Sequence, residues 1–217
     1  MNVIAINGSP RKTKNTATLL QKALDGAAGV GASTEMVHLY DYDFKGCVSC
    51  FACKVKDCKR PGICLYKDSM TPVLEKCLAA DAVILGSPIY FWDVTGEMRS
   101  FVERLMFPVL TYTEGYKGLL DRKIPIGLIY TMNVTEAFMQ ESGYGKLFEP
   151  AQAGLERLFG YCEVLNAYNT VQFDDYSKYV CTVFDEDAKK AWQKEQFPTD
   201  CENAYNLGVR LARQSKE

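Results

Sequence analysis

Short apolar stretches alternate with amphipathic stretches along nearly the whole chain. The first, residues 2–7, is apolar at almost every position, as in a strand buried on both faces. From about Asn15, a helical period places Leu19, Leu20, Ala23 and Leu24 on one face. Further apolar stretches predict strands at residues 33–39, 81–86, 124–130 and 162–168. Such repeated strand–helix units are typical of a parallel sheet.

The amphipathic stretches between the strands predict the remaining helices. One starts near Ser69, one at Thr95, and one covers residues 146–159. After a polar excursion, the last helix is expected to start at Thr199, because Thr199 and Glu202 have the spacing of a capping box.

This organisation predicts one α/β domain over residues 1–217, with five parallel strands and helices on both faces. Within it we expect a cysteine-rich loop at 43–67, extended loops at 107–123 and 132–145, and a C-terminal helical extension at 185–214. Long loops in a compact domain are usually functional or interfacial. The apolar and aromatic residues from Phe107 to Tyr116 favour a subunit interface for the first extended loop.

Composition narrows the function classes. Lys plus Arg number 25 and Asp plus Glu 27, so the chain has no basic excess and nucleic-acid binding is not expected. No apolar run approaches the roughly 20 residues that span a bilayer, and no leader precedes the first strand, so we expect a cytoplasmic protein without a membrane segment. His38 is the only histidine, which counts against a hydrolase that uses a histidine base.

Residues 8–16 form a candidate phosphate loop directly after the first predicted strand. A loop at the carboxyl end of a parallel strand that runs into a helix directs backbone N–H groups and the positive helix end at one point. The loop lacks the glycine patterns of dinucleotide-binding and P-loop proteins, which favours a terminal monophosphate. The side chains that add donors are Ser9, Arg11, Asn15 and Thr16.

Residues 86–92 form an aromatic loop after the third predicted strand. Ligands of open α/β sheets bind outside the carboxyl ends of the strands, where this loop and the phosphate loop are expected to meet. Its side chains suit a flat conjugated ring.

These two loops, together with Thr95 to Arg104, resemble the flavodoxin-like NAD(P)H-dependent FMN reductases, and most of all their iron–sulfur flavoprotein branch. The resemblance runs over about residues 1–170 and implies a flavodoxin-like three-layer sandwich with strand order 2-1-3-4-5, bound FMN, and a homodimer or homotetramer. It implies that Ser9, Arg11, Asn15 and Thr16 hold the phosphate. The flavin ring would lie against Ser87, Pro88, Ile89, Tyr90 and Phe91, with Thr131, Met132 and Asn133 as a third wall.

Five of the nine cysteines lie within residues 47–64. Cys47, Cys50, Cys53 and Cys58 have a compact spacing that suits a [4Fe–4S] cluster, and Cys64 adds a fifth thiol. Three interpretations stay open: a cluster, a loop of free thiols, and a zinc site. A cluster is expected between the flavin and the surface, because the loop follows the second strand and should lie beside the phosphate loop.

The leading hypothesis is an FMN-dependent oxidoreductase that takes electrons from NAD(P)H and passes them to a small-molecule or protein acceptor, with the difficult chemistry carried by the cofactor. The alternatives are a quinone or azo-compound reductase on the same scaffold, and a non-enzymatic flavodoxin-like electron carrier. Steady NAD(P)H oxidation with a soluble acceptor distinguishes an enzyme from a carrier.

Overall fold

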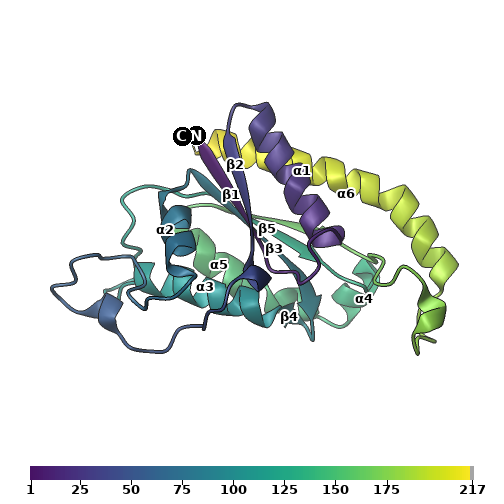
Figure 1. Cartoon of the computed structure of the whole chain (residues 1–217), viewed down its shortest axis with the longest axis horizontal. Coiled ribbons are helices and arrows are strands. Elements are labelled where there is room, and N and C mark those ends of the chain that lie inside the picture. The colour runs from purple at the N-terminus through teal and green to yellow at the C-terminus, as the bar shows by residue number, and fades with distance from the viewer. Residues whose placement is uncertain (216–217) are drawn as a thin grey trace.

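A parallel sheet forms the centre of the computed structural model, which describes residues 1–215. Its five parallel strands have the order β2-β1-β3-β5-β6, which confirms the predicted order (Figure 1). A two-residue strand, β4 (Asp93–Val94), pairs antiparallel with the end of β3 and was not predicted. The parallel strands are β1 (Asn2–Asn7), β2 (Ser33–His38), β3 (Ala82–Tyr90), β5 (Ile126–Thr131) and β6 (Cys162–Ala167).

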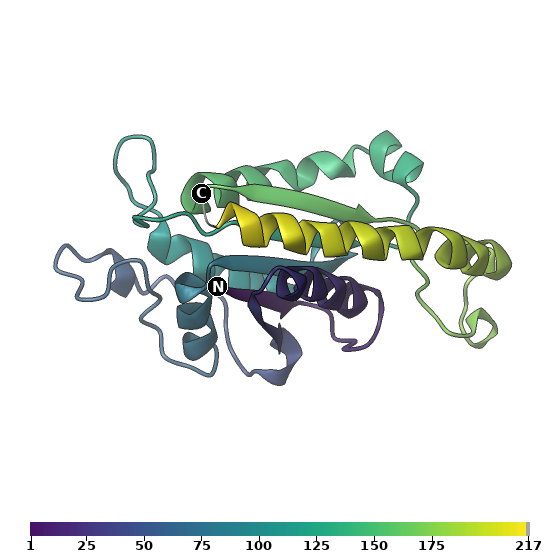
Figure 2. The same ribbon diagram turned by 90° about the horizontal axis from the view of Figure 1, so that it is seen from above.

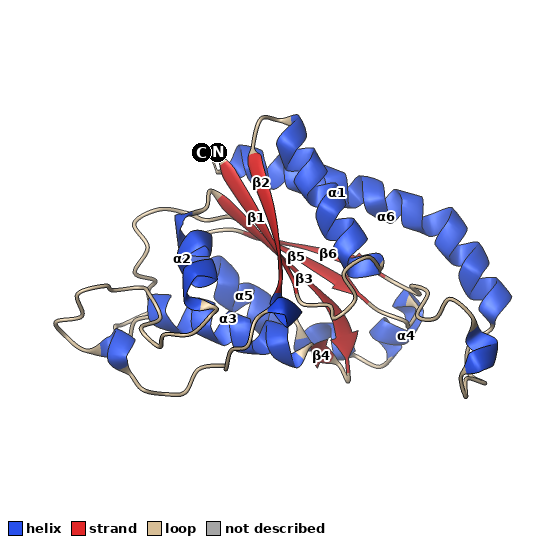
Figure 3. Ribbon diagram, viewed as in Figure 1, coloured by secondary structure: helices blue, strands red, loops and turns tan. Residues whose placement is uncertain are grey.

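Helices cover both faces of this sheet (Figure 3). Two lie on one face, α1 (Asn15–Gly29) and α6 (Glu186–Gln214), and three on the other, α2 (Thr71–Ala79), α3 (Gly96–Val109) and α5 (Glu149–Phe159). Strand side chains alternate between the two faces, so that Ile4 and Ile6 join one apolar core while Val3 and Ala5 join the other. The predicted helices on both faces are therefore present.

Helices α1 and α6 pack with their backbones in close approach. A Cβ on Gly208 would lie 1.8 Å from the carbonyl oxygen of Ala23, which no side chain tolerates. This glycine lets the long helix α6 lie along α1 over the sheet (Figure 2).

The predicted start of the last helix at Thr199 is wrong. Helix α6 begins at Glu186, and its cap is Asp185, whose carboxylate accepts a hydrogen bond from the N–H of Ala188 at 2.9 Å. Pro198 lies inside the helix instead of ahead of it. The first turns stay helical because they are anchored by tertiary contacts, above all through Lys189, which is buried.

The extended loops are shorter than predicted. The segment 132–145 contains helix α4 (Glu136–Glu141), which is capped by the Thr135 side chain. The segment 107–123 begins inside α3, since its first three residues are helical despite Pro108. Four single 3-10 turns complete the elements in the described residues, at Leu39–Asp41, Ala52–Lys54, Tyr144–Leu147 and Tyr176–Lys178. No helix within residues 1–215 is long and apolar enough to cross a membrane.

Candidate functional site

The phosphate loop is braced by the ends of β1, β2 and β3. The N–H of Ser9 donates to the Asn7 side chain at 3.0 Å, and the N–H of Arg11 donates to Ser9 Oγ at 3.1 Å. His38 lies 2.9 Å from the amide nitrogen of Asn7, and burial lowers the pKa of its imidazole, so the single histidine supports the loop in its neutral form. Gly8 is required here, because a Cβ at this position would lie 2.9 Å from the Met98 side chain.

Helix α1 begins at this loop without a side-chain cap. Its cap residue, Lys14, makes no capping hydrogen bond, and the first turn contains no acidic residue. The first backbone N–H groups of a helix have no partner within the helix and carry the positive end of its dipole. The start of α1 therefore offers donors and positive potential to an anion.

These elements enclose a cavity of about 350 Å³ at the carboxyl ends of the strands. Its volume falls within the range of small-molecule sites. The structure brings ten of the twelve sequence-predicted residues together in its wall: Ser9, Arg11, Asn15, Thr16, Pro88, Ile89, Tyr90, Phe91, Thr131 and Asn133. Their role in binding stays a prediction.

The other two predicted residues, Ser87 and Met132, do not line this cavity. Ser87 is buried, and its hydroxyl donates to the carbonyl of Pro88 and accepts from the N–H of Thr95, so it joins β3 to α3. Met132 packs in the core on the α3/α5 face. Met132 points away because side chains alternate along the extended backbone at the end of β5. Thr131 and Asn133 are therefore directed to the cavity, and the residue between them to the opposite face.

A segment that the sequence did not indicate closes the cavity. It covers residues 170–173, after β6, and it engages the phosphate loop. The Arg11 guanidinium donates to the carbonyl of Gln172 at 2.6 Å, and the Asn15 amide donates to the carbonyl of Val171 at 2.9 Å. Because these acceptors are main-chain atoms, no side-chain pattern revealed the contact.

Asn133 carries an unpaired polar atom in the cavity wall. Its amide nitrogen donates to the Gln172 side chain at 3.0 Å, whereas its Oδ1 is buried without a hydrogen-bond partner. A buried acceptor of this kind is costly unless a ligand or water completes it. Together with the uncapped start of α1 and the apolar residues of β3, it fits a ligand with a phosphate at one end and a flat ring with N–H groups at the other. FMN has these features.

Lys189 is a second residue that sequence reasoning missed. Its ammonium is buried in α6 and donates to the carbonyl of Asn133 and the Asn169 side chain, each at 2.8 Å. None of the described carboxylates pairs with it, and burial lowers its pKa to about 8. The lysine therefore ties together the two segments that supply Asn133 and residues 170–173 to the cavity.

The predicted aromatic loop is largely a strand. β3 continues to Tyr90 and turns through Phe91 and Trp92 into β4. Both turn residues have positive φ, 49° and 66°, where Asn-Gly is the favourable pair in a two-residue hairpin. Their rings are exposed, Phe91 by 92%. Bulky residues held in this strained conformation indicate a functional turn.

The cysteine-rich loop does not lie beside the phosphate loop, and that prediction is wrong. The chain turns back after β2 and runs along α3, where the N–H of Cys47 donates to Glu103 at 3.3 Å and Lys54 donates to the carbonyls of Phe107 and Leu110. Thr95, at the other end of α3, contacts the phosphate loop through Gly8. At 1.5 Å per residue, Glu103 and Phe107 are roughly 12 and 18 Å further along the helix axis.

The loop is anchored by Arg104, a buried arginine of α3. Its guanidinium forms an ion pair with Asp68 and donates to the carbonyls of Lys45 and Tyr66, at the two ends of the loop, and to Cys64 Sγ at 3.4 Å. Beyond these contacts the loop projects from the same end of the molecule as residues 110–118 (Figure 2).

Three of the four predicted metal ligands lie together, and the fourth lies apart from them. Cys47, Cys50, Cys53 and Cys64 line a narrow hollow of about 20 Å³, whereas Cys58 lies outside it. Burial raises the pKa of the Cys53 thiol. Among residues 1–215, no group of three or more His, Cys, Asp or Glu side chains is arranged to hold a metal ion. Four thiols nevertheless line one hollow, so the loop offers the ligand type that a cluster needs, with Cys64 in place of the predicted Cys58.

The chain is similar to known flavin-dependent proteins. A family model described as NADPH-dependent FMN reductase matches residues 1–132. An iron-sulfur flavoprotein of Archaeoglobus fulgidus is 40% identical over 104 residues, 48% of each chain, and one of Methanocaldococcus jannaschii is 38% identical over 104 residues, 48% of this chain and 51% of that one. The alignments thus span about half the length of these curated relatives.

Solved structures share the fold over nearly the whole chain. The NAD(P)H:quinone oxidoreductase from Methanothermobacter marburgensis superimposes with a TM-score of 0.69 and 16% identity, covering 97% of this chain and 98% of the other.

Proposed function

The chain belongs to the NADPH-dependent FMN reductase family, and from this premise we propose that it binds FMN in the cavity at the strand ends and passes electrons from NAD(P)H to an acceptor. The cavity supports this proposal most directly. Its size suits a small molecule, and its lining includes both the uncapped start of α1 and Asn133, whose Oδ1 is unpaired. These two features match the opposite chemical ends of FMN.

In this proposal the chain's own residues bind and orient the cofactor. The first-turn N–H groups of α1, with Ser9 and Thr16, receive the phosphate. Arg11 and Asn15 exchange their main-chain acceptors in residues 171–172 for phosphate oxygens. Asn133 accepts an N–H of the ring system, and the end of β3 supplies an apolar surface. When bound, FMN would supply the redox chemistry between the nicotinamide and the acceptor.

The proposal is tested by reconstitution with FMN and by turnover. We expect one FMN per chain, a visible flavin absorbance, and steady NAD(P)H oxidation with a soluble acceptor. A protein that binds FMN but shows negligible turnover would be a carrier, and a protein that takes up no FMN would refute the proposal.

We also propose that the cysteine-rich loop takes up a [4Fe–4S] cluster when iron and sulfide are supplied. The support is the compact spacing of Cys47, Cys50 and Cys53 and the similarity of the chain to iron-sulfur flavoproteins. Cys64 lines one hollow with these three cysteines and Cys58 lies outside it, so the fourth ligand is Cys64, or Cys58 if the loop rearranges on binding.

Anaerobic purification followed by iron and acid-labile sulfide assays tests the cluster. We expect about four irons per chain, lost in Cys50→Ser and kept in Cys181→Ser, whose cysteine lies outside the loop. Comparing Cys58→Ser with Cys64→Ser identifies the fourth ligand. Zinc without sulfide would mean a structural site, and neither metal after reconstitution would leave a loop of free thiols.

We also propose that the chain forms a homodimer or homotetramer in the cytoplasm. Phe107, Tyr112 and Tyr116 form a row of ring contacts beside the cysteine-rich loop, and Tyr112 and Tyr116 are exposed. Exposed aromatic patches of this kind favour a subunit interface. Light scattering at micromolar concentration checks it, and a monomer would contradict it.

A further inference from the structure

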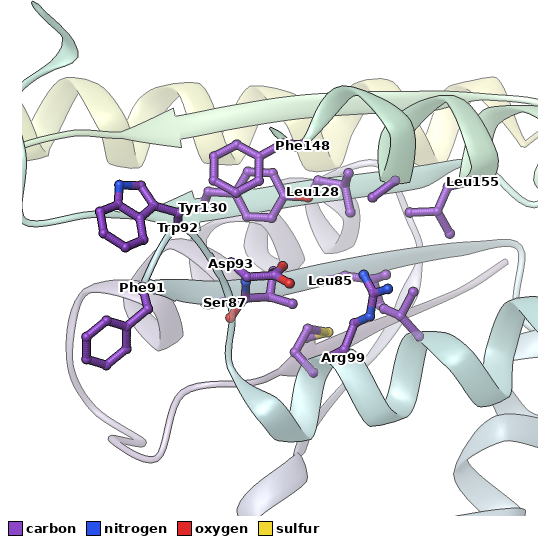
Figure 4. Close-up of a pocket in the computed structure, with 14 residues that line it drawn as sticks. Leu85, Ser87, Phe91, Trp92, Asp93, Arg99, Leu128, Tyr130, Phe148 and Leu155 are labelled. Carbon is purple, nitrogen blue, oxygen red and sulfur yellow. Dashed lines mark hydrogen bonds between the residues drawn. The ribbon is translucent and has the colours of Figure 1, made fainter. Parts of the chain in front are cut away.

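A second cavity lies on the α3/α5 face of the sheet (Figure 4). Its volume is about 430 Å³, within the usual range for small-molecule sites. The β3–β4 hairpin closes one end, and Phe91 lines both this cavity and the flavin cavity, so the two share a wall. The other walls are largely apolar, with Leu85 and Leu128 from the sheet, Val102 from α3 and Leu155 from α5.

Tyr130 brings an unpaired hydroxyl to this cavity. Its side chain is 4% exposed, and its ring lies 4.9 Å from the ring of Phe148. No hydrogen bond of the Tyr130 hydroxyl is made within the described part of the chain. Burial raises the pKa of this hydroxyl, so it stays protonated and acts as a hydrogen-bond donor at neutral pH. An unpaired donor in the lining of a largely apolar cavity can be met by an acceptor on a ligand.

The cavity is bordered by charged side chains of both signs. Arg99 and Asp93 both line it, and Arg99 extends from α3 toward it (Figure 4). Arg99 is also 3.6 Å from Glu103. Since the positive charge is matched by carboxylates, the cavity gives no net preference for an anion or a cation. A neutral ligand fits it best.

The shape of the wall favours a flat molecule. The rings of Tyr130 and Phe148 are tilted by only 33° and together form an aromatic wall. Phe91 and Trp92 stand at the end of the strained hairpin, with their rings directed away from the sheet (Figure 4). Aromatic side chains with a few polar groups are typical of sites for ring compounds.

We propose that the α3–α5 cavity is a second ligand site, which binds a flat, neutral ring compound through a carbonyl group that accepts the Tyr130 hydroxyl. The site is separate from the flavin cavity and does not require FMN. The two cavities lie on opposite sides of the β3–β4 hairpin, which contributes Phe91 to both.

Duroquinone is a suitable probe, because it is neutral and flat and its fully substituted ring resists addition of the chain's thiols. For this experiment Trp192→Phe is introduced into the 217-residue chain, so that Trp92 at the cavity is the remaining tryptophan. Binding is followed by quenching of its fluorescence. Durene, which has the same methylated ring without carbonyls, is measured by its displacement of duroquinone.

We expect saturable quenching with or without FMN. Tyr130→Phe should weaken duroquinone binding about 3- to 10-fold through loss of one hydrogen bond, and should change durene binding less than about 2-fold because durene makes no such bond. Ala151→Phe should fill the cavity and abolish binding of both. Ala153→Phe, at an exposed position of the same helix, should leave both unchanged.

Two results would overturn the proposal. One is quenching that does not saturate, or that persists in Ala151→Phe. The other is a Tyr130→Phe variant that weakens duroquinone and durene equally. If Ala151→Phe fails to fold, as judged by its melting curve, the comparison of the two probes on Tyr130→Phe decides alone, because that substitution removes only an oxygen atom.

Discussion

The cavity at the strand ends and the cysteine-rich loop are both indicated by clear sequence motifs, but the structure holds their residues in place by different means. The cavity residues come together from the ends of β1, β3 and β5, whose positions are set by a continuous ladder of paired strands. The cysteines lie on a loop held mainly by two side chains, Arg104 and Lys54. A motif on strand ends is positioned by the sheet, whereas a motif on a loop is positioned by a few anchors.

The largest expected effect is a loss of stability that changes the cysteine-rich loop but not the cavity. Arg104→Met should lower the free energy of unfolding by about 3 kcal/mol, because it leaves Asp68 without its partner and removes the donors that hold both ends of the loop. Urea denaturation measures it, with Arg99→Met as an exposed control on the same helix. FMN affinity should stay unchanged below the unfolding transition. A parallel loss of FMN affinity would show that the regions are not independent.

The second prediction concerns the cavity. The double variant Arg11→Ala, Asn15→Ala should weaken FMN about 100-fold, because two hydrogen bonds to the anionic phosphate, both of them charge-assisted, are lost. Riboflavin lacks the phosphate and should change little. Fluorescence titration of both flavins measures the difference. Lys12→Ala is the matched control, since Lys12 pairs with Asp41 and does not line the cavity. Equal losses for FMN and riboflavin would rule out the phosphate assignment.

The third prediction uses pH to examine Lys189, which ties the cavity segments together. Its folded pKa, about 8, lies below the ordinary 10.5, so between these values the unfolded chain binds more protons and stability rises with pH. The slope contributed by this lysine approaches about 1.4 kcal/mol per pH unit. Denaturation at pH 8 to 10.5 should show it in the wild type and in Lys190→Met, but not in Lys189→Met. Equal slopes in all three would contradict it.

The smallest expected effect concerns strain at the hairpin. Replacing Phe91 and Trp92 by Asn and Gly should raise the free energy of unfolding by about 1–2 kcal/mol, because these residues adopt positive φ more readily. Phe91 is almost fully exposed, so little burial is lost there. Thermal denaturation measures the gain. Alanine at both positions removes the rings but keeps the strain, and a similar gain in that variant would contradict the explanation.

The two regions also differ in how far the sequence predicted them. Gly8 to Thr16 was placed correctly after β1, because a glycine-bearing turn between an apolar strand and a helix is a local pattern. The side-chain alternation that removes Met132 from the cavity is local too, but it depends on where β5 ends. The closing segment 170–173 accepts hydrogen bonds on its own main-chain carbonyls from Arg11 and Asn15, which are distant in sequence, and no residue type in the segment signals such a contact.

The amino-acid sequence by itself determined the alternation of strands and helices and the residues of the two strand-end loops, because hydrophobic period and turn chemistry act over neighbouring residues. The order of the sheet followed from the resemblance to a known family that the two loops carry. Only the tertiary structure decided where the cysteine-rich loop lies, where α6 begins and which segment closes the cavity at the strand ends. These depend on buried contacts such as Arg104 with Asp68 and Lys189 with Asn133, which join residues 36 and 56 positions apart. Such contacts have no local pattern, since their energy comes from burial that exists only once the chain has folded.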